Sequence, residues 1–186
     1  MPDDQLRQEL VHQRQRKLAA VQELAARGSD ATYQFTGRPF SAALAGTHGR
    51  SEAAIHRWDI AGDDETSMEL LSAPDLTRHA VEILYTLPIL CEAPLSRARV
   101  ARIRELRIVL RSAAEPDVVM CINSRSARFE LAEIDQPADG DAVVETDPAH
   151  RLLSIWGRRT VRHPVTVIAD PKLWAPVAAV LWDATP

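Results

Sequence analysis

The apolar pattern of the chain changes its period near Leu106, and this change constrains the fold more than any other feature. Before it, apolar residues recur every three to four positions, as on one face of a helix; after it, they alternate with polar residues, as in a half-buried strand. One segment cannot follow both patterns, because side chains repeat about every 3.6 residues along a helix and every two along a strand. The sequence therefore predicts a two-domain α+β protein, with a helical domain over residues 1–95 and a small α+β domain over residues 104–186.

Helices are predicted in the first domain over residues 4–26, 40–60 and 74–91. Gly28 ends the first helix, and Pro39 opens the second. Pro74 lies in the first turn of the third helix, with Ser72 as its cap. Residues 29–39 hold two aromatic side chains but are bounded by glycine and proline, so we expect a loop there.

Strands are predicted in the second domain over residues 106–111, 117–122, 126–134, 141–146 and 164–169. Their short connections predict antiparallel pairing. Asp147 and Asp170 each precede a proline, and this pair of residues is typical of a capped helix N-terminus. We therefore expect an antiparallel-rich sheet covered by two helices, joined to the first domain by the arginine-rich residues 94–104.

Glu52 and His56 lie four residues apart in the second predicted helix. Side chains at this spacing share one face of a helix and lie close enough to bind a single cation. Zinc accepts imidazole nitrogen and carboxylate oxygen together, and a catalytic zinc site takes three protein ligands and leaves a position for water. Phe40, Leu44 and His48 precede the pair at the same spacing, so the row predicts that Glu52 and His56 point into the helical core.

A second interpretation of the pair stays open, since Glu and His four residues apart also form simple hydrogen bonds on helix surfaces. The two-residue motif lacks the constraint of a complete His-Glu-x-x-His signature. No third ligand is evident, because His48 and His56 lie about 12 Å apart along a straight helix axis. His12 is predicted to be a solvated surface residue, and His79 to lie at the boundary of an apolar helix face.

Composition argues against several classes of protein. A net charge of −4 gives no basic footprint for nucleic acid, and a hydrophobic fraction of 46% is ordinary for a globular protein. No apolar run approaches the roughly 18 residues that cross a bilayer, and the acidic start of the chain differs from a signal peptide. We therefore expect a cytoplasmic protein without nucleic-acid or membrane partners. Cys91 and Cys121 lie in apolar surroundings, which predicts two buried thiols.

Two runs of residues resemble one known family. They are Glu-Ala-Ala-Ile-His-Arg-Trp-Asp over residues 52–59 and Leu-Leu-Ser-Ile-Trp-Gly-Arg over residues 152–158. With the order of the predicted elements, they resemble the mycothiol-dependent maleylpyruvate isomerase family of the DinB-like superfamily, over most of the chain from Asp4 onward. The resemblance implies a four-helix bundle that holds a divalent metal, usually zinc, and carries Glu52 and His56 over as ligands. It places Asp59 where it supports the helix end or the imidazole.

The resemblance also implies what the metal is for. The family uses it to bind a small thiol, mycothiol, whose thiolate attacks a small electrophilic substrate in an isomerisation or transfer. The family's remaining ligand is a His on an earlier helix than the one that resembles residues 4–26, so we expect a partial DinB-like bundle. The face left uncovered on the opening helix predicts a homodimer.

Alternatives to an active enzyme remain. One is a non-catalytic binding or assembly module with a vestigial metal site, and another is a truncated product that folds only with a partner. Arg158 likewise has two interpretations. It either offsets the negative end of the helix that Gly157 closes, or binds the carboxylates of an anionic substrate.

Overall fold

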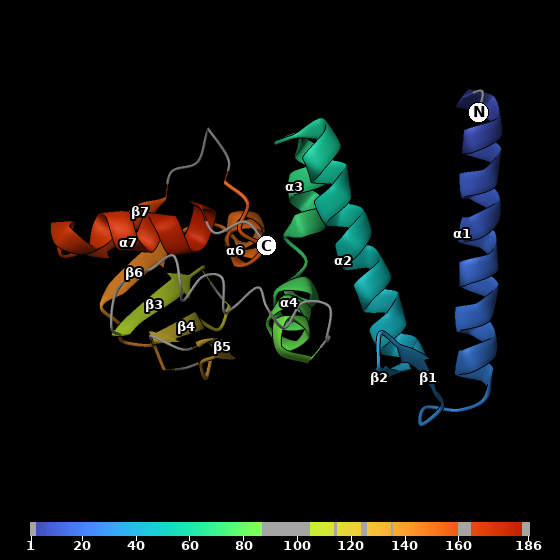
Figure 1. Cartoon of the computed structure of the whole chain (residues 1–186), viewed down its shortest axis with the longest axis horizontal. Coiled ribbons are helices and arrows are strands. Elements are labelled where there is room, and N and C mark those ends of the chain that lie inside the picture. The colour runs from blue at the N-terminus through green and yellow to red at the C-terminus, as the bar shows by residue number, and fades with distance from the viewer. Residues whose placement is uncertain are drawn as a thin grey trace. The chain divides into compact units, whose positions relative to one another are not determined.

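The computed structural model describes residues 3–86, 105–113, 115–123, 126–134, 136–159 and 165–183 (Figure 1). A helical N-terminal part is followed by a part that contains a sheet, which confirms the α+β prediction at this level. The chain divides into two compact units, Met1–Gly49 and Arg50–Pro186, and the division falls within helix α2 (Ala42–Ala61). The predicted linker lies outside the described residues, so the predicted domain boundary and the DinB-like bundle stay predictions.

The first unit contains a β-hairpin where a loop was predicted, so that prediction is wrong. The hairpin consists of β1 (Thr32–Phe35) and β2 (Arg38–Ser41), paired antiparallel. Thr36 and Gly37 have φ angles of 49° and 86°, and positive φ at both central residues is the geometry of the two-residue turn that suits strand twist. Phe40 is fully buried, with the Phe35 ring 5.0 Å and the His48 ring 5.7 Å from it.

Helix α1 (Asp3–Ala26) also belongs to the first unit, and its bounds agree with the prediction. Gly28 follows it with a φ of 112°, in the left-handed region that glycine favours. Leu24 is the buried residue of this helix, while four other large apolar side chains are exposed. These are Leu6, Leu10, Val11 and Leu18. The uncovered apolar stripe is therefore present, and the homodimer expected from it stays a prediction.

The helices of the second unit include one that the sequence analysis missed. This is α3 (Glu65–Leu71), whose N-cap is Asp64; the Asp64 carboxylate accepts a hydrogen bond of 2.7 Å from the Ser67 backbone N–H. Ser72 was predicted to cap the next helix, but it is the C-cap of α3, so that prediction is wrong. Helix α4 (Pro74–Thr86) begins at the expected proline, and the remainder of the predicted helix lies outside the described residues.

A five-stranded sheet forms the centre of the second unit. Its strands are β3 (Glu105–Arg111), β4 (Val118–Asn123), β5 (Ala127–Leu131), β6 (Ala142–Glu145) and β7 (Thr166–Ala169). Their order is β5-β4-β3-β6-β7, and three of the four pairings are antiparallel, as predicted. The pairing of β3 with β6 is parallel, because the chain after β5 crosses to the other side of β3 before β6 begins.

Helices pack beside this sheet (Figure 1). Asp147 caps α6 (Pro148–Ile155) through the backbone N–H of His150, and Gly157 closes the helix with a φ of 73°. Asp170 caps the short helix η2 (Pro171–Leu173), which continues into α7 (Trp174–Ala178) and η3 (Ala179–Asp183). Both predicted aspartate caps are therefore confirmed. None of the helices in the described part of the chain is apolar over enough residues to span a membrane.

Candidate metal-binding site

Glu52 and His56 lie on the part of α2 that belongs to the second unit, and they face solvent. Their side chains are 42% and 63% exposed, so the prediction that they point into a core is wrong. A helix turns about 100° per residue, so a row of residues four apart drifts by about 40° at each step. Between Leu44 and His56 the row drifts by about 120°, and the buried side of α2 near the pair is formed by Ser51, Ala54 and Ile55.

Asp59 fixes the imidazole of His56. The His56 Nδ1 atom lies 3.0 Å from Oδ2 of Asp59. Hydrogen bonds from Arg158 hold the pKa of the Asp59 carboxyl below its usual range, so this group is ionised and accepts only. His56 therefore donates from Nδ1, and in the neutral ring the lone pair belongs to Nε2.

Arg158 in turn fixes Asp59. Its guanidinium donates two hydrogen bonds to the two carboxylate oxygens, from Nε at 2.7 Å and from Nη2 at 2.9 Å. This bidentate geometry is the strong form of an arginine–carboxylate contact. Arg158 comes directly after Gly157, which turns the chain at the end of α6 toward α2. This contact with Asp59 was not predicted. A further hydrogen bond of 3.4 Å from Nη1 of Arg158 to the Trp156 carbonyl places the guanidinium at the end of α6, as the structural interpretation expected, and the binding of an anionic substrate stays a prediction.

The donor atoms of the pair fit a metal ion. Nε2 of His56 lies 3.5 Å from Oε2 of Glu52, beyond the usual range of a hydrogen bond. Two ligand atoms on one tetrahedral zinc ion, with bonds of about 2.0 to 2.1 Å, lie roughly 3.3 to 3.4 Å apart. The separation therefore suits a shared cation. The alternative is a protonated His56 between two carboxylates, which is an ordinary surface ion pair.

Within the residues that the structure describes, no third ligand joins Glu52 and His56. In the described part of the chain, no three side chains of the ligating types His, Cys, Asp and Glu gather as they would around one metal ion. His12 lies on exposed α1, as predicted. His79 lies in α4 and is buried, although it was predicted at the boundary of that face.

His150 makes a contact that was not predicted from the sequence. His150 is buried in the first turn of α6, and its Nδ1 lies 2.6 Å from Oδ2 of Asp147. Burial lowers the pKa of this imidazole, against the opposing effect of Asp147. The same carboxylate caps the helix, so the contact belongs to the structure of the helix start. The Asp-Pro-x-His spacing was the available signal for this contact.

Cys121 is partly exposed, so its predicted burial is wrong, while Cys91 lies outside the described residues. The sulfur of Cys121 accepts a hydrogen bond of 3.1 Å from Nη1 of Arg107, and Cys121 lines a polar cleft of about 520 Å³ on the sheet. The carboxylate of Asp141, another residue of this cleft, accepts a hydrogen bond of 2.8 Å from the backbone N–H of Arg107. The described residues of the cleft carry both signs of charge and do not form a ligand set for a metal.

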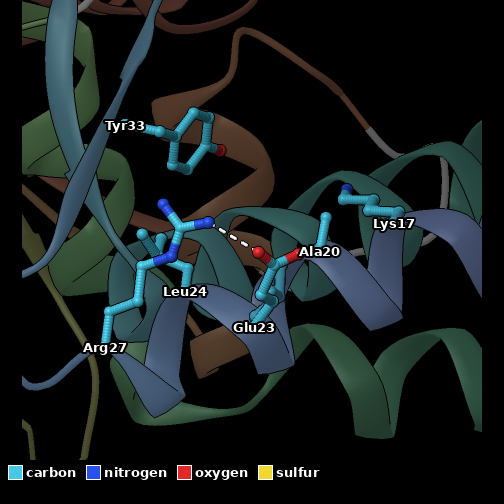
Figure 2. A pocket seen from close by; sticks show the side chains of 7 residues that line it. Lys17, Ala20, Glu23, Leu24, Arg27 and Tyr33 are labelled. Atoms are coloured by element: carbon cyan, nitrogen blue, oxygen red, sulfur yellow. Dashed lines mark hydrogen bonds and ion pairs between the residues drawn. The ribbon is translucent and has the colours of Figure 1, made fainter.

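Another pocket, of about 380 Å³, lies beside the C-terminal half of α1 (Figure 2). Ala20 and Leu24 contribute apolar surface to it, and the Tyr33 ring lies across from the helix. Arg27 turns toward Glu23, with which it forms an ion pair of 2.6 Å. The described residues that line this pocket include neither His nor Cys, so they do not form a typical zinc-binding donor set.

Comparison with known proteins assigns no family. No family model matches the chain, and no curated protein sequence matches it. One solved structure to which the chain is similar is described as a UbiJ-SCP2 ubiquinone synthesis protein. The likeness covers 59% of this chain and 92% of that chain, at 14% sequence identity and a TM-score of 0.31. A likeness at this level supports no inference about function, and it does not bear on the resemblance to maleylpyruvate isomerases.

Proposed function

We propose that this chain binds a divalent metal ion, zinc in the first instance, through Oε2 of Glu52 and Nε2 of His56. The observation that carries the proposal is the distance of 3.5 Å between these two atoms. Since Asp59 keeps the imidazole proton on Nδ1, a carboxylate and a nitrogen lone pair face one another, and a cation between them satisfies both.

The chemistry that we propose for the site follows the resemblance to thiol-dependent isomerases. When bound, the metal supplies positive charge that favours the thiolate of a small thiol such as mycothiol, the nucleophile for isomerisation or transfer on a small electrophilic substrate. Glu52 offsets part of the metal charge, His56 provides a neutral donor, and Asp59 holds that donor in its tautomer. Arg158 keeps Asp59 ionised and in place.

A second candidate function is a non-catalytic assembly module in which the metal has a structural role. The exposure of the pair favours this candidate, because a catalytic site keeps its substrate away from bulk water. The two functions differ in whether the bound metal has a coordination position open to a thiol.

Metal analysis of the purified protein tests the proposal. After loading with zinc and dialysis, the wild-type chain is expected to retain zinc, and His56→Ala and Glu52→Gln are expected to lose it. Asp59→Asn is expected to weaken zinc binding by roughly 10- to 100-fold, because it releases the imidazole from its tautomer. His12→Ala removes an exposed histidine on α1 and serves as the control, with retention expected. Equal zinc in wild type and His56→Ala, or none in wild type, contradicts the proposal.

If zinc is retained, the catalytic form of the proposal is tested with cobalt in its place. Adding mycothiol is expected to produce the absorption of a cobalt–thiolate bond in the wild type but not in Glu52→Gln or His56→Ala. If the cobalt spectrum of the metal-loaded protein does not change when the thiol is added, the metal has no coordination position open to a thiol. The assembly module is then the better description.

A further inference from the structure

The Glu52–His56 pair supplies only half of a closed zinc site. Structural zinc sites in proteins are four-coordinate with four protein ligands. Within the described residues no third ligand approaches the pair, and both side chains project from the exposed side of α2. A further pair of donors can therefore reach the same ion from outside the chain.

We propose that two copies of this chain share one zinc ion across a two-fold axis, each contributing Glu52 and His56. In a contact of this symmetry, residue i of one copy meets residue j of the other, and residue j meets residue i. An axis that crosses α2 between these positions brings Glu52 opposite the partner's His56 and His56 opposite the partner's Glu52. Four ligands result, two carboxylate oxygens and two imidazole nitrogens. The inference rests on the metal-binding part of the proposed function and favours its assembly form.

Charge on this face of α2 agrees with such a contact. Asp59 is neutralised by Arg158, and Arg57 forms an ion pair with Asp64. Glu52 therefore contributes the acidic charge at the centre of the contact, and two copies bring two such carboxylates together. Without a cation these repel, whereas one Zn²⁺ balances the two carboxylates. Association by this face is thus expected to depend on the metal.

An apolar side chain lies next to the donors. Ile60 follows His56 by four residues, on the same side of α2, and is 89% exposed. Contact between two copies of this face would remove Ile60 from water, which is favourable by roughly 25 cal/mol for each Å² of apolar area. This area alone is small, so zinc supplies the main attraction and Ile60 adds to it.

The experiment measures mass and metal content together on the full chain. Molar mass is determined by light scattering with size exclusion, in chelator, with zinc and with magnesium, and zinc is counted by elemental analysis. A monomer is expected in chelator and magnesium. A dimer with about half an equivalent of zinc per chain is expected when zinc is added, since one ion serves two copies.

Variants separate this contact from others. Glu52→Gln and His56→Ala are expected to abolish the zinc-dependent dimer while keeping the wild-type circular dichroism, because both side chains are exposed. Ile60→Ser keeps the ligands and is expected to raise the dimer dissociation constant several-fold. Ile134→Ser, at a similarly exposed isoleucine outside α2, is the matched control and should leave the dimer unchanged.

Each other outcome has a distinct meaning. A monomer with one zinc per chain overturns the shared site and leaves the proposed metal binding standing. A wild-type chain that retains no zinc overturns both. A dimer that persists in chelator and in His56→Ala is formed by another surface, and it also overturns the shared site.

Discussion

Removing Arg158 is expected to destabilise the second unit through the loss of its contact with Asp59. The pair joins the end of α2 to the residue after Gly157 by two hydrogen bonds, of 2.7 and 2.9 Å. The two side chains are 25% and 33% exposed, so solvent screens the interaction. Exposed ion pairs contribute about 0.2 to 1 kcal/mol, and the bidentate geometry places this pair at the upper end, about 1 kcal/mol.

A double-mutant cycle isolates this coupling. The wild type, Arg158→Gln, Asp59→Asn and the double variant are unfolded in urea, with tryptophan fluorescence as the signal. We expect a coupling free energy of about 1 kcal/mol, and a fall in Tm of roughly 2 to 4 °C for Arg158→Gln in a chain of this size. Added salt should reduce the coupling. If the two single effects add to give the double variant, the pair contributes nothing and the argument is refuted.

The pH dependence provides a second check. The Arg158 hydrogen bonds lower the folded-state pKa of Asp59, so its carboxylate stabilises the fold at pH values above its unfolded pKa, which is about 3.9. That stabilisation is lost as pH falls through the lower, folded pKa. The difference in stability between wild type and Arg158→Gln is therefore expected to be constant from roughly pH 5 to 8 and to shrink below about pH 4. A difference that grows as the solution is acidified has the wrong sign.

Two further substitutions test the packing of the second unit by urea unfolding. Glu115→Gln is expected to cost about 3 kcal/mol, because it leaves the guanidinium of Arg151, which is 1% exposed, without its charged partner; Glu130→Gln, in the exposed pair with Arg128, should cost less than about 0.5 kcal/mol. Equal effects of these two changes would show that burial does not matter. Gly140→Ala is expected to cost about 1 to 3 kcal/mol, since its Cβ would lie 2.8 Å from the Arg107 carbonyl oxygen and 2.9 Å from Val109 Cγ2. Gly46→Ala, in the part of α2 that belongs to the first unit, is the control and is followed by circular dichroism. Its Cβ would meet nothing within 4 Å, so the change should be neutral or stabilising by up to about 1 kcal/mol, and destabilisation would contradict the steric explanation.

Local signals in the sequence predicted the elements that local chemistry determines. The aspartate–proline pairs at Asp147 and Asp170 marked helix starts, because a carboxylate cap and a fixed φ both act within one turn. The short helix α3 was missed because its seven residues, about two turns, give little periodicity. The parallel pairing of Ile108 with Ala142 was missed for another reason: the choice of a pairing partner is made between distant segments and leaves no local pattern.

The candidate site divides in the same way. The spacing of Glu52 and His56 correctly predicted that they lie side by side, which is a property of any helix. It did not predict which side of α2 they occupy, because a row of residues four apart drifts by about 40° at each step, and the elements that pack against the helix decide which side is buried. The contact between Asp59 and Arg158 joins residues 99 apart in sequence. Both residues lie in the runs that carry the family resemblance, but no spacing rule predicts that residues so far apart form a hydrogen bond.

The division of the chain affects how its unfolding must be observed. All four tryptophans, at positions 58, 156, 174 and 182, lie in the second unit, whereas α1 contributes 24 helical residues to the first. Fluorescence therefore follows the second unit alone, while far-ultraviolet circular dichroism also counts a helix with a single buried residue, Leu24. Such a helix can fray at low denaturant without altering the fluorescence. Non-coincident curves from the two probes would then report a loosely held α1, and a free energy of unfolding would belong to the tryptophan-bearing unit alone.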